Sequence, residues 1–142
     1  MTGFSPALLV LEDGTTWPGF GFGARADATG EIVFNTSLAG YQEILTDPSY
    51  RGQLVTLTCP HVGNTGVNDR DDESGRVWAA GLVVRDLSPV VSNWRATGRL
   101  DDWLRGHGRP AITGVETRAL VRHIRERGAM RAALSTGDPD PA

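Results

Sequence analysis

Residues 30–69 read GEIVFNTSLAGYQEILTDPSYRGQLVTLTCPHVGNTGVND, and the order of signals in this stretch decides the fold. The apolar run at 32–34 predicts a buried strand, and the run at 54–58, which alternates and is rich in β-branched residues, predicts a second one. Between them, residues 41–45 predict a short helix. It ends before Pro48, because the residue preceding a proline is displaced from the α region.

Further elements are predicted outward from this stretch. Residues 7–11 are apolar and end at a Glu-Asp-Gly turn signal, which predicts a hairpin into a glycine-rich strand that starts at Thr15. Residues 77–84 and 130–135 predict two more strands. Residues 100–105 predict a helix, because two aspartates favour its start and two glycines favour its end.

The clearest predicted helix begins at Thr113. Thr113 and Glu116 match the capping box, in which each side chain satisfies a free N–H group at the helix start, and Gly128 supplies a C-terminal cap. The apolar face of this helix carries Ala119, Leu120, His123 and Ile124. The rest of its surface carries Arg118, Arg122 and Arg125. Strands in the first half, and helices alternating with strands in the second, predict an α/β fold: a single domain with a mixed sheet.

Length and charge restrict the classes of function. The 142 residues fit one domain with its own core. The formal net charge of -3 argues against non-specific nucleic-acid binding, which relies on clustered basic charge. No apolar run approaches the ~20 residues that span a bilayer, and one cysteine cannot form an internal disulfide. We therefore expect a cytoplasmic protein without nucleic-acid or membrane partners.

Several residue patterns are similar to chemical sites, and each favours a structural interpretation. Cys59 is the only thiol, but Pro60 removes an N–H group where an oxyanion donor is needed, and the glycines of a nucleophile elbow are missing. The segment GFGFGA at 19–24 matches a loose dinucleotide pattern, but no helix is predicted after it, which favours a strand. The histidines show no metal-ligand spacing. His123 is expected to be a partnered core or interface residue.

Five segments carry a resemblance to a known family. They are FNTS at 34–37, TDPSY at 46–50, GLVVRD at 81–86, SNWR at 92–95 and ETRALVRHIRERGAM at 116–130. In these segments, and in its ALLVLEDG opening, the chain resembles the N-terminal domain of the small subunit of glutamine-dependent carbamoyl phosphate synthetase. The resemblance implies a swivelling β/β/α fold for residues 1–136. It places residues 137–142 at the start of a linker to a separate glutaminase domain.

The resemblance also implies a function for the longer protein. The small subunit hydrolyses glutamine and passes ammonia to the large subunit, which makes carbamoyl phosphate from bicarbonate and ATP for arginine and pyrimidine synthesis. This domain is implied to supply the interface with the large subunit and part of the glutamine pocket. It is expected to carry no catalytic nucleophile, metal or cofactor, since ATP and magnesium are used by the large subunit. Two alternatives stay open: a free-standing interaction module that has lost the glutaminase domain, and a small hydrolase using Cys59 and His61.

Ser49 is the residue that the resemblance assigns to glutamine binding. From the residues alone, a serine at this position is favoured as a turn residue beside Asp47. Polar residues of the surrounding loops are expected to line an interface: Asn35, Ser37, Tyr41, Gln42, His61, Asn64 and Asn68. One departure from the family lies at Glu116, where aspartate is expected before Thr117.

Overall fold

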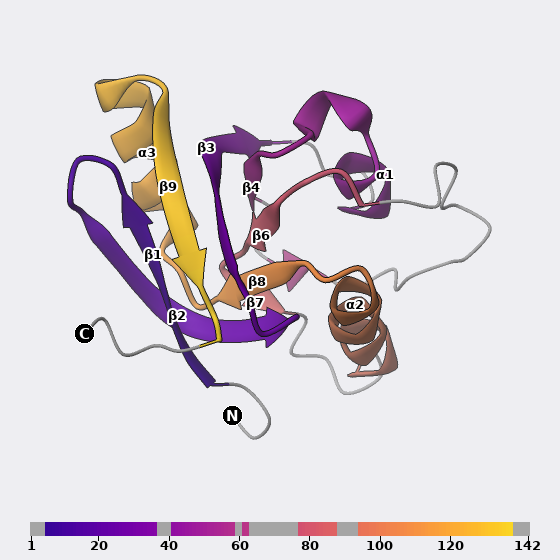
Figure 1. Cartoon of the computed structure of the whole chain (residues 1–142). Coiled ribbons are helices and arrows are strands. Elements are labelled where there is room, and N and C mark those ends of the chain that lie inside the picture. Colours follow the sequence, from indigo (N-terminus) through magenta and orange to yellow (C-terminus); the bar gives the residue numbers. More distant parts are fainter. Residues whose placement is uncertain (1–4, 37–40, 59–60, 63–76, 88–93, 138–142) are drawn as a thin grey trace.

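The computed structural model describes residues 5–36, 41–58, 61–62, 77–87 and 94–137. Within these residues, one sheet closes into a barrel in the order β1, β2, β8, β6, β4, β3, β9, and β5 pairs with β7 in a separate sheet (Figure 1). The strands are β1 (Ser5–Leu11), β2 (Thr16–Gly23), β3 (Asp27–Asn35), β4 (Leu54–Leu57), β5 (His61–Val62), β6 (Gly81–Val83), β7 (Asp86–Leu87), β8 (Pro110–Thr113) and β9 (Met130–Ser135). The helices are α1 (Tyr41–Leu45), α2 (Trp94–Gly106), α3 (Thr117–Arg127) and the 3-10 helix η1 (Pro48–Tyr50).

The barrel sheet is mixed, as the sequence predicted. The run β3, β4, β6, β8 is parallel, whereas β1, β2 and β9 join it through antiparallel pairs. The predicted hairpin is confirmed: β1 pairs with β2, and the turn between them uses a φ of +89° at Gly14. The last strand, β9, lies between β1 and β3 and closes the barrel. The chain is therefore an α/β domain with a closed mixed sheet.

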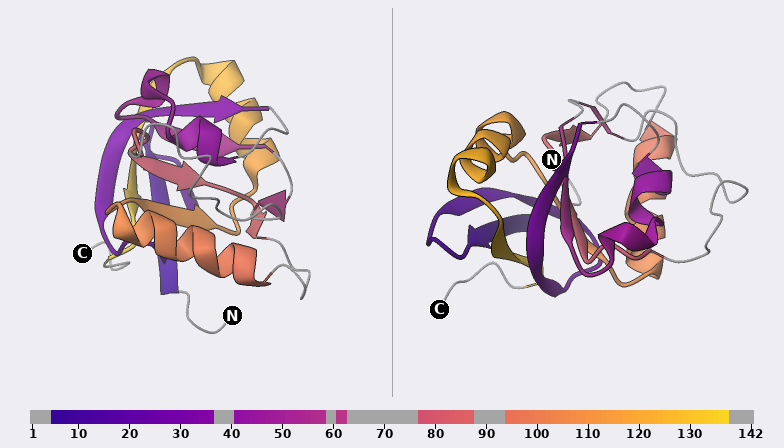
Figure 2. Two further views of the ribbon diagram at one scale, coloured as in Figure 1. Left: turned by 90° about the vertical axis from the view of Figure 1, so that its right-hand side faces the viewer. Right: turned by 90° about the horizontal axis from the view of Figure 1, so that it is seen from above.

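Two buried clusters hold the helices on opposite sides of the barrel (Figure 2). The first joins α1 and α2 to one face of the parallel strands and includes Leu45, Leu104, Val55 and Leu82. The second joins α3 to the other face, and to β1 and β9, and includes Leu120, Leu9, Leu134, Leu54 and Val83. Neighbouring residues of β4 and of β6 thus belong to different clusters. Both faces of these strands are buried, as is usual for parallel strands that are covered on two sides.

The predicted capping box at Thr113 is wrong. Thr113 is the last residue of β8, a strand that the sequence did not reveal, and its hydroxyl donates to the carbonyl oxygen of Arg85 at 3.3 Å. Helix α3 begins at Thr117, and its N-cap, Glu116, makes no side-chain capping hydrogen bond. The threonine is unavailable as a cap because β8 buries it between β2 and Arg85. The C-terminal cap is confirmed, since the N–H group of Gly128 donates to the carbonyl of Ile124.

The bounds of one helix and one strand, and the apolar face of α3, also differ from the prediction. Helix α2 begins at Trp94, so its aspartates do not mark the helix start. The carboxylate of Asp101 instead accepts a hydrogen bond from the N–H group of Gly23 at 2.6 Å, which fastens α2 to β2. It also pairs with Arg105 of the same helix at 2.7 Å. Of the predicted strand 77–84, only the β6 residues pair in the sheet. On α3, Ala119 is exposed, and the apolar face is completed by Val121.

Asp13 ties the turn between β1 and β2 to α3. Its Oδ1 accepts hydrogen bonds from the backbone N–H group of Thr15 at 3.1 Å and from the Thr15 hydroxyl at 2.8 Å. Its Oδ2 lies 2.6 Å from Nε2 of His123, whose ring also meets the edge of Trp17. These hydrogen bonds lower the pKa of Asp13 from 3.8 to about 2, and the two from Thr15 make the largest contribution. His123 is thus a partnered residue, as the sequence predicted.

Gly30→Ala tests how closely β3 approaches the turn before β4. A Cβ atom on Gly30 would overlap the backbone carbonyl oxygen of Gly52, which cannot rotate away. We expect this variant to lower the free energy of unfolding by about 1–3 kcal/mol, the usual cost of overpacking. The control, Gly106→Ala, places its Cβ atom in open space at the end of α2 and should be neutral or stabilise by up to about 1 kcal/mol. Equal stability of both variants in urea would contradict this packing.

The lowered pKa of Asp13 predicts a loss of stability in acid. The pKa of Asp13 is about 2 in the folded chain, against an ordinary value of 3.8. The ionised carboxylate therefore contributes its full stabilisation at pH values above 3.8, and this contribution is lost as the pH falls through 2. Asp13→Asn should lower the free energy of unfolding near neutral pH and flatten its dependence on pH in this acid range. Urea denaturation across the range measures both effects. Asp27→Asn, at an exposed position of β3, is the control; equal pH dependence in Asp13→Asn and wild type would refute the contribution.

Candidate functional site

The predicted glutamine-binding residue, Ser49, lies in the 3-10 helix η1. This helix forms because Asp47 supplies its N-cap: the Asp47 carboxylate accepts a hydrogen bond from the N–H group of Ser49 at 3.0 Å. Pro48 occupies a position where a missing N–H group costs nothing. Ser49 is exposed. The turn geometry expected from the residues alone is therefore present, and it presents the serine side chain to solvent.

A side-chain hydrogen bond fastens η1 to the sheet. The Nδ2 atom of Asn35, at the end of β3, donates to the hydroxyl of Tyr50 at 2.8 Å. Tyr50 also packs against the cluster under α1 and α2. Tyr50, the residue after Ser49, is thus fixed, while Ser49 itself is exposed. A hydroxyl held in this way can donate a hydrogen bond to a ligand and accept another.

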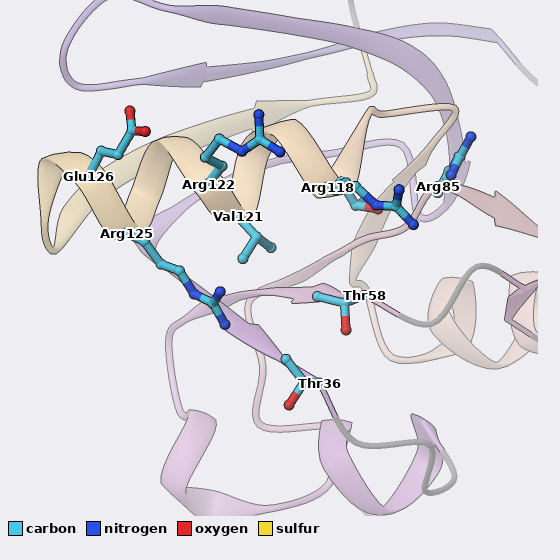
Figure 3. Close-up of a pocket in the computed structure, with 9 residues that line it drawn as sticks. Thr36, Thr58, Arg85, Arg118, Val121, Arg122, Arg125 and Glu126 are labelled. Carbon is cyan, nitrogen blue, oxygen red and sulfur yellow. The ribbon is translucent and has the colours of Figure 1, made fainter.

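A pocket lies where the parallel strands end, beside α3 (Figure 3). Parallel strands place their carboxyl ends at one edge of a sheet, which is where ligands commonly bind. Here Thr36 follows β3, Thr58 follows β4, and Arg85 comes two residues after β6. The residues that α3 contributes are Thr117, Arg118, Val121, Arg122, Arg125 and Glu126. The cavity measures about 400 Å³.

The pocket is strongly basic. Among the residues that the structure describes, four arginines line it against one carboxylate, that of Glu126. Arg85 lies 3.9 Å from Glu116, a long contact between exposed groups, and the guanidinium of Arg125 lies 5.0 Å from the centre of the Phe34 ring. Among the described residues, Arg118 and Arg122 make no ion pair. The positive charge of the pocket is therefore largely uncompensated within this part of the chain.

The sequence did not reveal this pocket. As predicted, Arg118, Arg122 and Arg125 are exposed and lie off the buried face of α3. Their spacing of i, i+4 and i+7 places them along one stripe of the helix, which lines the pocket. That spacing was the available signal. The part played by Thr58 and Arg85 depends on which strands are neighbours in the barrel, and no local pattern shows this.

The remaining sites predicted from the sequence either have a structural role or lie outside the described residues. The segment 19–24 lies in β2 up to Gly23, and β3 follows without a helix, so the strand interpretation is confirmed. In the part of the chain that the structure describes, no group of three acidic, histidine or cysteine side chains is placed to hold a metal ion. None of the described helices has the length and the apolar composition of a membrane span. The following lie outside the described residues: Cys59, Ser37, Asn64 and Asn68, and the side chains of Tyr41, Gln42 and His61.

The sequence of this chain matches a known protein family over most of its length. Residues 9–134 match the family model described as carbamoyl-phosphate synthase small chain, CPSase domain. The chain belongs to this family. The carbamoyl phosphate synthase small chain of Xylella fastidiosa (strain 9a5c) is 58% identical over 135 residues, which cover 95% of this chain and 36% of that protein. The small chain of Streptomyces avermitilis is 56% identical over 136 residues, with 96% and 36% covered.

The family resemblance expected from the sequence is thus confirmed. The chain spans about a third of the length of the curated small chains that it matches. Among solved structures, an aminopeptidase from Aneurinibacillus sp. strain AM-1 is similar, with a TM-score of 0.51 and 14% identity over 93% of this chain and 33% of that one. At this identity the similarity concerns the fold alone.

Tyr50→Phe tests the bond that positions the Ser49 segment. The variant removes only the hydroxyl that Asn35 contacts and should lower the free energy of unfolding by about 1 kcal/mol. A double-mutant cycle with Asn35→Ala isolates the coupling, which is necessary because Asn35 makes a further interaction. Urea denaturation of the four proteins measures it. A coupling energy near zero would contradict the proposed anchor.

Proposed function

We propose that this chain is the N-terminal part of the small subunit of glutamine-dependent carbamoyl phosphate synthetase. In this role the complete small subunit hydrolyses glutamine and delivers ammonia to a large subunit, which uses bicarbonate and ATP to make carbamoyl phosphate for arginine and pyrimidine synthesis. The observation that carries the proposal is the family match over residues 9–134, joined by relatives of the same name at 56–58% identity. The free-standing interaction module gains no support from these relatives.

The proposed division of labour leaves the chemistry to other parts of the enzyme. We assign no catalytic nucleophile to residues 1–142, because Cys59 is the only cysteine and its sequence surroundings lack the glycines of a nucleophile elbow. ATP and magnesium belong to the large subunit, and no cofactor is assigned here. Residues 1–136 form the proposed swivelling β/β/α domain, and residues 137–142 begin a linker to the glutaminase domain. The enzyme is proposed to work in the cytoplasm, without nucleic-acid or membrane partners.

Within this domain, two tasks are proposed: to contact the large subunit and to complete the glutamine pocket through Ser49. Two features of the structure support the second task. Ser49 is exposed, and the segment carrying it is fixed by the Asp47 cap and by the Asn35–Tyr50 hydrogen bond. A ligand-binding hydroxyl on a fixed segment loses little conformational entropy when it binds.

Ser49→Ala tests the glutamine assignment in a small subunit that includes the glutaminase domain, assembled with the large subunit. Loss of one hydrogen bond, about 1–2 kcal/mol, should raise the KM for glutamine by roughly 5- to 30-fold. Synthesis from free ammonia should be unchanged, because it bypasses the glutamine pocket. Ser135→Ala, at the end of β9, serves as the matched serine control. An unaltered KM for glutamine in Ser49→Ala would leave Ser49 as a turn residue only.

A further inference from the structure

The arginine-lined pocket beside α3 concentrates charge of one sign in a chain of the opposite sign. The whole chain has a formal net charge of -3, yet among the described residues four arginines line this cavity with a single carboxylate. Arg118 and Arg122 lack ion-pair partners among the described residues. Positive potential focused in a concave site raises the local concentration of anions.

The same arrangement works against the stability of α3. Arg118 and Arg122 are four residues apart, and Arg122 and Arg125 are three apart, so like charges face each other along the helix surface. Arg118 also lies in the first turn, where the helix dipole favours a negative charge. Glu116, the N-cap, makes no side-chain hydrogen bond to the helix start. An anion bound in the pocket would reduce the repulsion between the arginines and offset the unfavourable position of Arg118 in the helix dipole.

The lining supplies hydrogen-bond donors from several directions. Figure 3 shows Arg125 pointing from α3 toward Thr36 and Thr58, and Arg118 extending toward Arg85. The guanidinium of Arg125 is oriented by the Phe34 ring. Guanidinium groups form paired hydrogen bonds to phosphate and carboxylate oxygens, and threonine hydroxyls add single ones.

The size and chemistry of the pocket select the ligand class. A cavity of about 400 Å³ lies in the range of small-molecule sites and far exceeds the ~30 Å³ of one water molecule. Val121 and the arginine stems provide an apolar wall for an organic group. A phosphate group presents three oxygens that can accept from donors on different sides, whereas a carboxylate presents two in one plane.

We propose that this pocket binds a phosphate-bearing small molecule. The arginines of the lining, Arg118 and Arg125 among them, bind the phosphate, and the organic part lies against Val121. This site is separate from Ser49 and does not depend on the function proposed above. Its occupancy would couple the start of α3 to the ends of β3 and β4.

The test is titration of the 142-residue chain with pyrophosphate, followed by calorimetry and by amide chemical shifts at low ionic strength. We expect saturable binding at one site, with the largest shifts at Thr58, Arg85 and Thr117. Arg118→Ala should weaken binding by about ten-fold, as expected for loss of a charge-assisted hydrogen bond at an accessible site. Arg125→Ala provides a second variant with the same expected result, in case one substitution disturbs the fold seen by circular dichroism.

Arg127→Ala is the matched control, because Arg127 is an exposed arginine of the same helix that does not line the pocket. It should change pyrophosphate affinity by less than about two-fold. An equal loss of affinity in Arg127→Ala, or no saturable binding to the wild-type chain, would overturn the site. Citrate, which carries carboxylates without phosphate, distinguishes the ligand class: binding as tight as that of pyrophosphate would overturn the assignment to phosphate.

Discussion

Burial of both faces of the parallel strands is the constraint on which the rest of the structure depends. Along β4, Leu54 packs toward α3 while its neighbour Val55 packs toward α1 and α2. In β6 the same division separates Val83 from Leu82. Full burial of such a side chain stabilises the fold by roughly 1.5–3 kcal/mol relative to exposure. The central strands therefore hold helices on two sides at once, and side chains on both of their faces are buried.

Parallel pairing also determines where polar groups can gather. Consecutive parallel strands require crossover connections, so the chain leaves β3, β4 and β6 at the same edge of the sheet. Side chains just past this edge lie outside the buried core, and the structure places Thr36, Thr58 and Arg85 there. Helix α3 brings its arginine stripe to the same edge. The basic pocket is thus a consequence of topology, assembled from segments that are distant in sequence.

Local signals in the sequence predicted most elements but few of their relationships. The β1–β2 hairpin, α1 and β9 follow from turn residues, a proline and strong periodicity, which act over a few residues. Thr113 misled because its spacing to Glu116 fits a helix start, whereas pairing of β8 with β2 overrides that preference. The Ser49 turn was predicted from Asp47 and Pro48, but its anchor to Asn35 requires the fold. The basic pocket needed the strand order, which no local pattern contains.

The position of β9 has a consequence for synthesis of the chain. Met130–Ser135 fill the gap between β1 and β3, two strands that are complete within the first 35 residues. Until the ribosome has released residues near 135, both strands present unpaired backbone edges, which are sites of aberrant association between chains. Closure of the barrel is therefore a late event that joins the two ends of the domain. A nascent chain of this family depends on protection of those two edges until β9 has been synthesised and can pair with both.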